Sequence, residues 1–301
     1  MIRSLKIFSS LACLCLTALT AHAQIDRLAL PQRSPTAMTG LQFRDNVTSL
    51  SLADRERAVY QQVMTGNVPD FLRQLIPISV TQTLNGQPRS ATWYVTPDYL
   101  AVGSADNYFR MPMSPRLAQW IADGTSTTLP TSKMVDAIWQ QAPYRLVPSP
   151  LTPDATMITV PVFWQHQLLV QSQRQTAGHT DGTLLAGHKK DVVISPRLHD
   201  PATSGRVAIY GWHQANGSPI QPVYLGHAET WVDYSHGIRL VGTSMLLDGT
   251  TVTVNDVLTS SAVQSLLNKE PQTYSTTAPP RYNAGSPPPI EGANVGDWPA
   301  Y

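Results

Sequence analysis

Helical periodicity marks three segments in the first half of the chain. Ser51 can cap a helix over residues 52–65, whose apolar side chains repeat along one face and which Gly66 closes. Two shorter helices are predicted over residues 115–122, where a proline opens the first turn, and over residues 132–142.

Strict alternation of apolar and polar residues predicts two hairpins and further strands. The hairpins turn at Asn85-Gly86, between residues 78–84 and 91–96, and at Asp248-Gly249 within residues 245–254. The other predicted strands cover residues 157–163, 191–195, 206–212, 223–225 and 230–241. Asn255 is expected to cap a last helix that reaches about residue 267.

These elements predict an α+β fold in which the second half is rich in strands. Its sheet is expected to be mixed or antiparallel, either open or barrel-like. We expect an N-terminal extended arm and helix/hairpin subdomain over residues 24–150, a proline-rich connector near residue 150, and a strand-rich domain over residues 151–270. Residues 271–301 are rich in proline, serine and threonine and are predicted to be a disordered or loosely attached tail.

The first 23 residues have the three parts of a secretory signal peptide. Arg3 and Lys6 form the charged start, residues 7–19 form an apolar core too short for a stable membrane span, and Ala21-His22-Ala23 provides the cleavage site. The sequence therefore predicts export to the periplasm or the extracellular space, with an uncleaved anchor as the alternative.

Composition then limits the chemistry of the mature chain. Cys13 and Cys15 both lie in the signal peptide, so the mature protein has no disulfide, thiolate ligand or cysteine nucleophile. Loss of Arg3 and Lys6 leaves 19 of 21 basic residues against 20 acidic ones, a net charge of −1. With Lys189-Lys190 as the only adjacent lysines and no basic stripe, nucleic acid is not an expected partner.

The histidines indicate where chemistry is expected. Of the eight in the sequence, all but His22 lie between residues 166 and 236, and histidine is suited to proton transfer near neutral pH. His166, His179 and His199 are expected in surface loops. The candidates lie beside glycines or at strand ends, where a rigid sheet presents polar groups to a cleft: His188, His213, His227 and His236.

Two further patterns extend this candidate site. In the predicted strand 230–241, alternation places His236 with the apolar side chains and Ser235 and Arg239 on the other face, so His236 lines a pocket or is simply buried. Asp191 lies in an otherwise apolar strand close to His188, and the two are predicted to form an acid–base pair, with an edge-strand ion pair as the alternative.

The same region also contains candidate substrate-binding residues and candidate metal ligands. Trp212, Tyr234 and Lys189 are expected to bind substrate, since aromatic faces beside polar groups stack on sugar rings, although aromatic residues in strands are often core. Three histidines with Asp191 or Asp233 could hold a catalytic zinc ion. No H-E-x-x-H motif supports this alternative, and our prediction includes no cofactor.

Four segments resemble an uncharacterised family of exported bacterial proteins, a resemblance that implies no activity. They are Thr96-Pro97-Asp98-Tyr99-Leu100-Ala101-Val102-Gly103-Ser104, Leu129-Pro130-Thr131-Ser132-Lys133-Met134-Val135-Asp136, Gly187-His188-Lys189-Lys190-Asp191-Val192-Val193 and Asp233-Tyr234-Ser235-His236-Gly237-Ile238-Arg239-Leu240.

Ser235-His236-Gly237-Ile238-Arg239 also resembles the Ser-His-Gly-Cys motif of the L,D-transpeptidase (YkuD-like) catalytic domain, with an upstream histidine matched by His213. The cysteine nucleophile is missing. The resemblance therefore implies at most a related scaffold and not transpeptidation.

Together these features predict an exported hydrolase that acts on peptidoglycan or another envelope or extracellular polymer. His188 and His236 are its expected proton-transfer groups, Asp191 orients a histidine, and Arg239 stabilises negative charge. His213 and Ser235 are expected to belong to the same catalytic site. The alternative is a non-catalytic binding or structural protein of the envelope.

Overall fold

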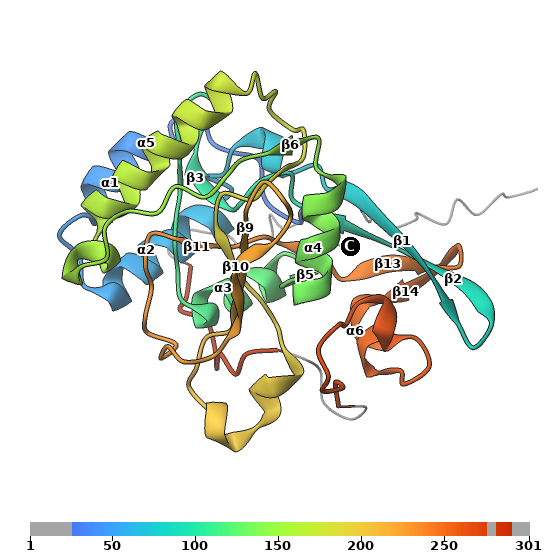
Figure 1. Ribbon diagram of the computed structural model, residues 1–301. Helices are drawn as coiled ribbons and strands as arrows, with labels where there is room; N and C mark the ends of the chain where they lie inside the picture. The colour runs from blue at the N-terminus through green and yellow to red at the C-terminus, as the bar shows by residue number, and fades with distance from the viewer. Residues whose placement is uncertain (1–25, 276–280, 291–301) are drawn as a thin grey trace, which may run out of the picture.

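The computed structural model describes residues 26–275 and 281–290, so the predicted signal peptide, residues 1–23, lies outside the described residues. The described chain has the predicted α+β fold (Figure 1). Its helices are α1 (Gly40–Val47), α2 (Leu52–Met64), α3 (Pro115–Gly124), α4 (Ser132–Gln141), α5 (Val160–Thr176) and α6 (Val254–Thr259).

Two open sheets carry most of the strands. Antiparallel pairing joins six strands in the order β14-β13-β2-β12-β5, with β1 paired to β2; these are β1 (Ile76–Leu84), β2 (Gln87–Val95), β5 (Thr127–Thr128), β12 (Val241–Gly242), β13 (Ser244–Leu247) and β14 (Thr250–Thr253). The second sheet, in the order β10-β9-β8-β11, comprises β8 (Lys190–Val192), β9 (Ile209–His213), β10 (Pro219–Tyr224) and β11 (His236–Gly237).

The second sheet is mixed, because β11 runs parallel to β8 while the other pairs are antiparallel. Two small pairs complete the described strands, β3 (Ala101–Gly103) with β4 (Tyr108–Arg110) and β6 (Tyr144–Arg145) with β7 (Leu185–Ala186). Neither larger sheet closes on itself, so the barrel-like alternative is wrong.

Local sequence signals produce the elements that were predicted correctly. Asn85 and Gly86 both have positive φ, 49° and 76°, as do Asp248 and Gly249, 50° and 81°. A two-residue turn of this kind matches the twist of the flanking strands, so both hairpins form as expected. Side chains of Ser51, Ser114 and Thr131 cap α2, α3 and α4.

Two predictions are wrong, the extended N-terminal arm and the strand over residues 157–163. Helix α1 lies within the arm, where Thr39 and Gln42 form a reciprocal capping box. Residues 157–163 were predicted as a strand, but a 3-10 turn (Ala155–Ile158) leads into α5, which has a proline in its first turn and many glutamine and leucine residues. His166 is therefore fully buried on a helix and not in a surface loop.

Residues 230–241 also depart from the predicted continuous strand, since only β11 and β12 form there. Asp233 accepts hydrogen bonds from the backbone N–H and the hydroxyl of Ser235, and this turn interrupts extended pairing. The last helix differs too. Thr253, not Asn255, caps α6, which ends at Thr259 before a 3-10 turn (Gln264–Leu266).

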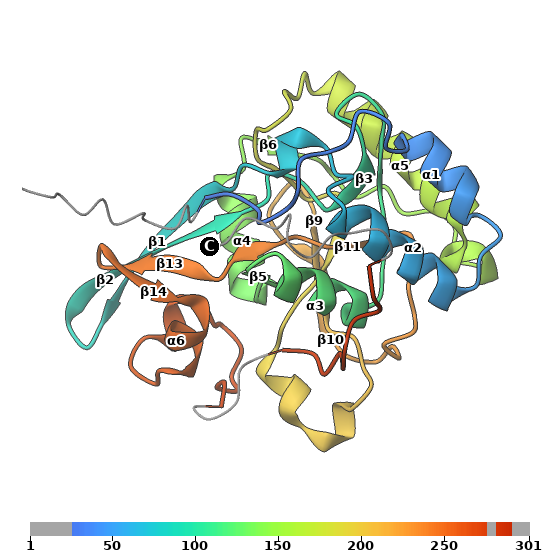
Figure 2. The ribbon, with the colours of Figure 1, turned by 180° about the vertical axis from the view of Figure 1, so that it is seen from behind.

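A single large cluster of apolar side chains draws on both halves of the chain, including Phe43, Trp93, Phe163, Ile209 and Val257. Residues on both sides of the predicted boundary near residue 150 therefore contribute to one core. Figure 2 shows the hairpin β1–β2 beside β13 and β14 at one end of the molecule and α1, α2 and α5 at the other.

The described part of the C-terminal tail is anchored rather than loose. The Tyr274 hydroxyl donates to the carbonyl of Ile194 at 2.9 Å, and the Tyr282 hydroxyl donates to the carbonyl of Val193 at 2.6 Å. Both rings are buried. These tyrosines tie the tail to the ends of β8 and β9.

Candidate functional site

The residues predicted to be functional gather around the parallel pair β8–β11, but nearly all of them lie in the protein interior. His188, Lys189, Asp191, Ser235, His236 and Arg239 are each at most 2% exposed. In the register of this pair, Lys190 lies opposite His236 and Asp191 opposite Gly237. Their side chains therefore separate into groups on the two faces of the sheet.

His188 pairs with Asp98 and not with the predicted Asp191. Its Nε2 lies 3.0 Å from Oδ1 of Asp98, and the guanidinium of Arg110 contacts the same carboxylate through Nε at 3.0 Å. Burial raises the pKa of Asp98, but Arg110 and His188 outweigh it and hold that pKa well below its usual range. Burial lowers the pKa of His188 to about 4, so its neutral ring donates from Nε2.

Asp191 belongs to a second buried group with Tyr99 and Arg239. Its Oδ2 accepts a hydrogen bond from the Tyr99 hydroxyl at 2.8 Å, its Oδ1 has no hydrogen-bond partner among the described residues, and Nε of Arg239 is 3.9 Å away. Burial raises the pKa of Asp191 to about 6, although Arg239, Tyr99 and His213 each lower it. The carboxyl therefore titrates near neutral pH.

Arg239 does not face a cavity as predicted. Its terminal nitrogens donate to the carbonyls of Thr96 and Leu185, each at 2.7 Å, and its guanidinium lies 4.5 Å from the centre of the Tyr99 ring. These contacts tie three separate chain segments together. Arg239 is therefore buried and holds these segments together, and its predicted role in stabilising negative charge stays a prediction.

The opposite face of the sheet holds His236, Ser235 and Asp233. His236 Nε2 lies 3.6 Å from Asp233, and neither ring nitrogen has a hydrogen-bond partner within the described chain. Burial lowers the pKa of His236 to about 4 even though Asp233 raises it. His236 is thus a buried neutral histidine, which was the alternative given for it.

The three residues predicted to bind substrate are buried as well. Nζ of Lys189 donates to the carbonyl of Tyr234 at 2.5 Å, and burial lowers its pKa to about 7. The Tyr234 hydroxyl accepts from the backbone of Leu151, and Trp212 packs under Lys190 in a left-handed backbone conformation, φ 57°. None of the three offers an exposed stacking face.

His213, one of the predicted catalytic residues, lines a cavity of about 410 Å³. Its Nε2 lies 3.0 Å from Oδ1 of Asp136, a residue of α4, which packs against β9 (Figure 1). Tyr210 donates to the same oxygen at 2.6 Å, and Lys269 contacts both Asp136 and the Tyr210 hydroxyl. Burial raises the pKa of Asp136, but the hydrogen bonds from His213, Lys269 and Tyr210 lower it overall.

This arrangement fixes the His213 ring in one orientation. The ionised Asp136 accepts from Nε2–H, which leaves the lone pair on Nδ1, and Nδ1 forms no hydrogen bond in the described chain. Trp139 stacks on the ring at 5.5 Å and Tyr210 meets it edge-on at 5.7 Å. A carboxylate that holds one imidazole nitrogen and frees the other is the arrangement of a general base.

The cavity residues and Asp191 lie on the same face of the sheet. Asp191 is directly paired with Tyr210 across β8 and β9, and side chains of paired residues share a face. The charge of His213 also affects the pKa of Asp191. Asp191, whose pKa is raised to about 6, therefore lies beneath the cavity and is electrostatically coupled to His213 in its lining.

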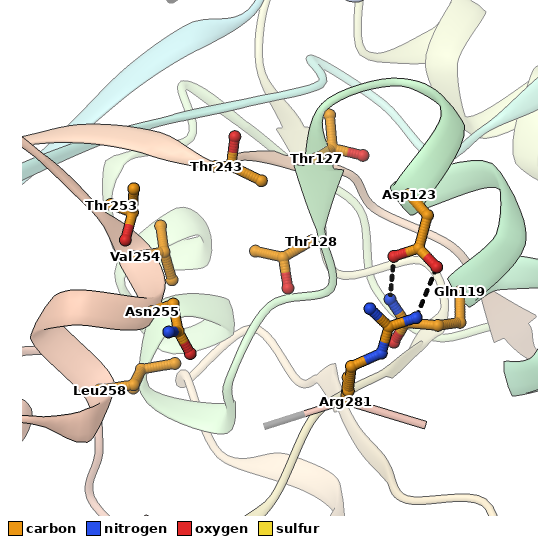
Figure 3. Close-up of a pocket in the computed structure, with 10 residues that line it drawn as sticks. All are labelled: Gln119, Asp123, Thr127, Thr128, Thr243, Thr253, Val254, Asn255, Leu258 and Arg281. Carbon is orange, nitrogen blue, oxygen red and sulfur yellow. Dashed lines mark hydrogen bonds and ion pairs between the residues drawn. The ribbon is translucent and has the colours of Figure 1, made fainter. Parts of the chain in front are cut away.

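A second cavity, of about 360 Å³, has different chemistry (Figure 3). Hydroxyls of Thr127, Thr128 and Thr243 surround an apolar wall that includes Leu258. Its charged residues, Asp123 and Arg281, pair with each other at 2.5 Å. With no imidazole and no free carboxylate in its lining, this cavity offers no acid–base pair.

Comparison with protein-family models, with curated proteins and with solved structures finds no match. In the described residues, no group of three histidine, cysteine, aspartate or glutamate side chains is placed to hold a metal ion. The same part of the chain contains no helix with the length and apolar character needed to cross a membrane. The geometry of the His213 cavity is therefore the basis for assigning a function.

The buried histidines predict a pH-dependent stability. His188 and His236 have folded pKa values of about 4, below the ordinary 6.5, so between these values the unfolded chain binds more protons and stability rises with pH. Asp191 acts oppositely between 3.8 and about 6, because its folded pKa is raised. Burial lowers the pKa of His166 on α5 even further. Three histidines outweigh one aspartate by about two protons, so we expect the free energy of unfolding to rise with pH by up to about 2.7 kcal/mol per unit.

Urea unfolding at about pH 5 and pH 6.5 measures this slope. In the variant His236→Gln one of the three histidine contributions is removed, and the slope is expected to decrease accordingly. A free energy of unfolding that is constant or falls over this range would contradict the burial of three neutral histidines. The variant Asp248→Asn serves as a control, since that carboxyl is on the surface hairpin.

Proposed function

We propose that the protein is an exported hydrolase that acts on an envelope or extracellular polymer at the His213 cavity. The observation that carries the proposal is the His213–Asp136 pair, in which a buried and oriented imidazole lines an open cavity with one nitrogen free. The predicted signal peptide supports the proposed location, and peptidoglycan remains the favoured substrate.

In the proposed reaction His213 acts as the general base. Nδ1 takes a proton from a water molecule as the water oxygen bonds to the electrophilic carbon of the polymer. The bond to the leaving group then breaks, and the leaving group receives the proton from the imidazolium. Asp136 stabilises the positive ring, and the ammonium of Lys269 in the cavity wall favours negative charge that develops on the substrate.

The rim of the cavity suits a polar polymer. Gln140 and Asn216 are exposed amides in the lining, while Trp139 is packed against His213 and Gly217 and has no free face for stacking. Recognition in the proposal therefore relies on hydrogen bonds to hydroxyl and amide groups, not on stacking against Trp212 or Tyr234 as predicted.

The main alternative, a non-catalytic envelope binding protein, is favoured by one observation. Most of the predicted catalytic residues are buried, and His188, Asp191 and Arg239 have partners that account for them structurally. A protein that only binds would retain the His213 cavity as a ligand site.

Incubating the purified mature protein with isolated peptidoglycan and a panel of glycans separates the two functions. We expect soluble fragments, detected by mass spectrometry, from at least one polymer, with and without chelator. Release that stops on addition of chelator would support the zinc alternative instead. Co-sedimentation with a polymer but no fragments would support the binding protein and contradict hydrolysis.

A further inference from the structure

Three arginines line a third cavity, of about 510 Å³, which is separate from the His213 cavity. Arg116 comes from the first turn of α3, Arg206 from the loop before β9, and Arg281 from the C-terminal tail. Arg206 and His213 lie at opposite ends of β9, and the linings of the two cavities share no residue. Any ligand here would therefore be bound independently of the proposed reaction.

Each arginine is held in position by a contact with the protein. Arg116 forms an ion pair with Glu229 at 2.8 Å. Arg281 forms an ion pair with Asp123 at 2.5 Å, and both of these residues also line the threonine-lined cavity (Figure 3). Arg206 donates from Nη1 to the carbonyl of Gly226 at 2.9 Å. Long side chains that are already restrained lose less conformational entropy when they bind a ligand.

The charge in this cavity is not balanced by its own lining. Three guanidinium groups, which stay ionised at all relevant pH values, face one lining carboxylate, Glu229. Asp123, which is not part of the lining, neutralises the charge of Arg281. Arg206 is exposed and has no ion-pair partner among the described residues.

The backbone beside Arg206 is open to a ligand. Gly205 has a φ of 68°, and nothing lies within 4 Å of where its Cβ would be. The exposed hydroxyl of Ser204 and amide of Asn283 add hydrogen-bonding groups to the lining. Arginine forks with neighbouring hydroxyl and amide groups match the several oxygens of a phosphate or carboxylate.

We infer that this arginine cavity, lined by Arg116, Arg206 and Arg281, is a binding site for an oxyanion group, either phosphate or carboxylate, of a larger ligand. The site requires no chemistry at His213. It therefore stands whether the protein is a hydrolase or a binding protein.

Isothermal titration calorimetry with inorganic phosphate and, separately, with succinate tests the site at constant ionic strength, since added salt screens such contacts. We expect at least one anion to bind, and Arg206→Gln to weaken its binding at least tenfold. Tighter binding of phosphate than of succinate would identify a phosphate-bearing ligand, and the reverse a carboxylate-bearing one. The matched control Arg89→Gln, on the β1–β2 hairpin, should bind as the unmodified protein does.

Two outcomes would overturn the inference. One is the absence of binding by both anions, and the other is an equal loss of affinity in Arg206→Gln and Arg89→Gln. Circular dichroism and the melting temperature of Arg206→Gln establish that it is folded, which is expected because its side chain is on the surface. If Arg206→Gln did not fold, Arg116→Gln would test the same cavity from another element.

Discussion

Replacing Asp98 by alanine is expected to lower the free energy of unfolding by about 3–5 kcal/mol, the range for breaking one side of a buried ion pair. Asp98 accepts hydrogen bonds from Arg110, from His188 and from the backbone N–H of Tyr99 at 2.7 Å. Its loss would leave the guanidinium of Arg110, 1% exposed, without its carboxylate. Urea unfolding followed by circular dichroism measures the change.

Two further variants separate the buried charge from the mere loss of a side chain. Asp70→Ala removes the partner of Arg73 at a position where the aspartate is 75% exposed, and is expected to cost about 0–1 kcal/mol. The double variant Asp98→Leu with Arg110→Met removes both charges and should recover part of the lost stability. Equal effects of Asp98→Ala and Asp70→Ala would show that the Asp98 network has no special structural role.

The parts of the fold that were predicted correctly depend on neighbours in sequence. Asn85-Gly86 and Asp248-Gly249 specify tight turns through their own backbone preferences, and Ser51 and Ser114 cap helices through hydrogen bonds to residues three positions on. Such signals operate within a few residues, so they can be seen in the sequence without knowing the fold.

The pairings in the site could not be predicted in the same way, because their partners are distant in the chain. His188 is 90 residues from Asp98, and His213 is 77 residues from Asp136. Asp191, the acidic residue nearest to His188 in sequence, lies three positions away but bonds to Tyr99 instead. Proximity in sequence therefore selected the wrong partner for His188.

Burial was the second source of error. The alternation seen over residues 230–241 predicted one buried face, yet residues 232–241 are buried on every side. When both faces of a segment are buried, alternation of apolar and polar residues no longer distinguishes a core face from a solvent face. Polar residues such as Ser235 and Asp233 can then lie in the interior because they hydrogen-bond to each other. The cavity at His213 depends on α4 packing against β9, which no local pattern specifies.

His213→Gln is expected to reduce the rate of polymer hydrolysis by about 10²–10⁴-fold, the usual contribution of a general base. Glutamine can keep a hydrogen bond to Asp136 but cannot accept and release a proton, so binding of the polymer should change little. Release of fragments at limiting enzyme, followed by mass spectrometry, measures the rate.

Asp136→Asn should reduce the same rate by a smaller factor, because the imidazole remains but loses the charge that stabilises its protonated form. His227→Gln is the matched control, since the His227 ring packs against the rings of Tyr224 and Trp231 and is not part of the cavity lining. Equal rates for His213→Gln and the control would exclude His213 as the base.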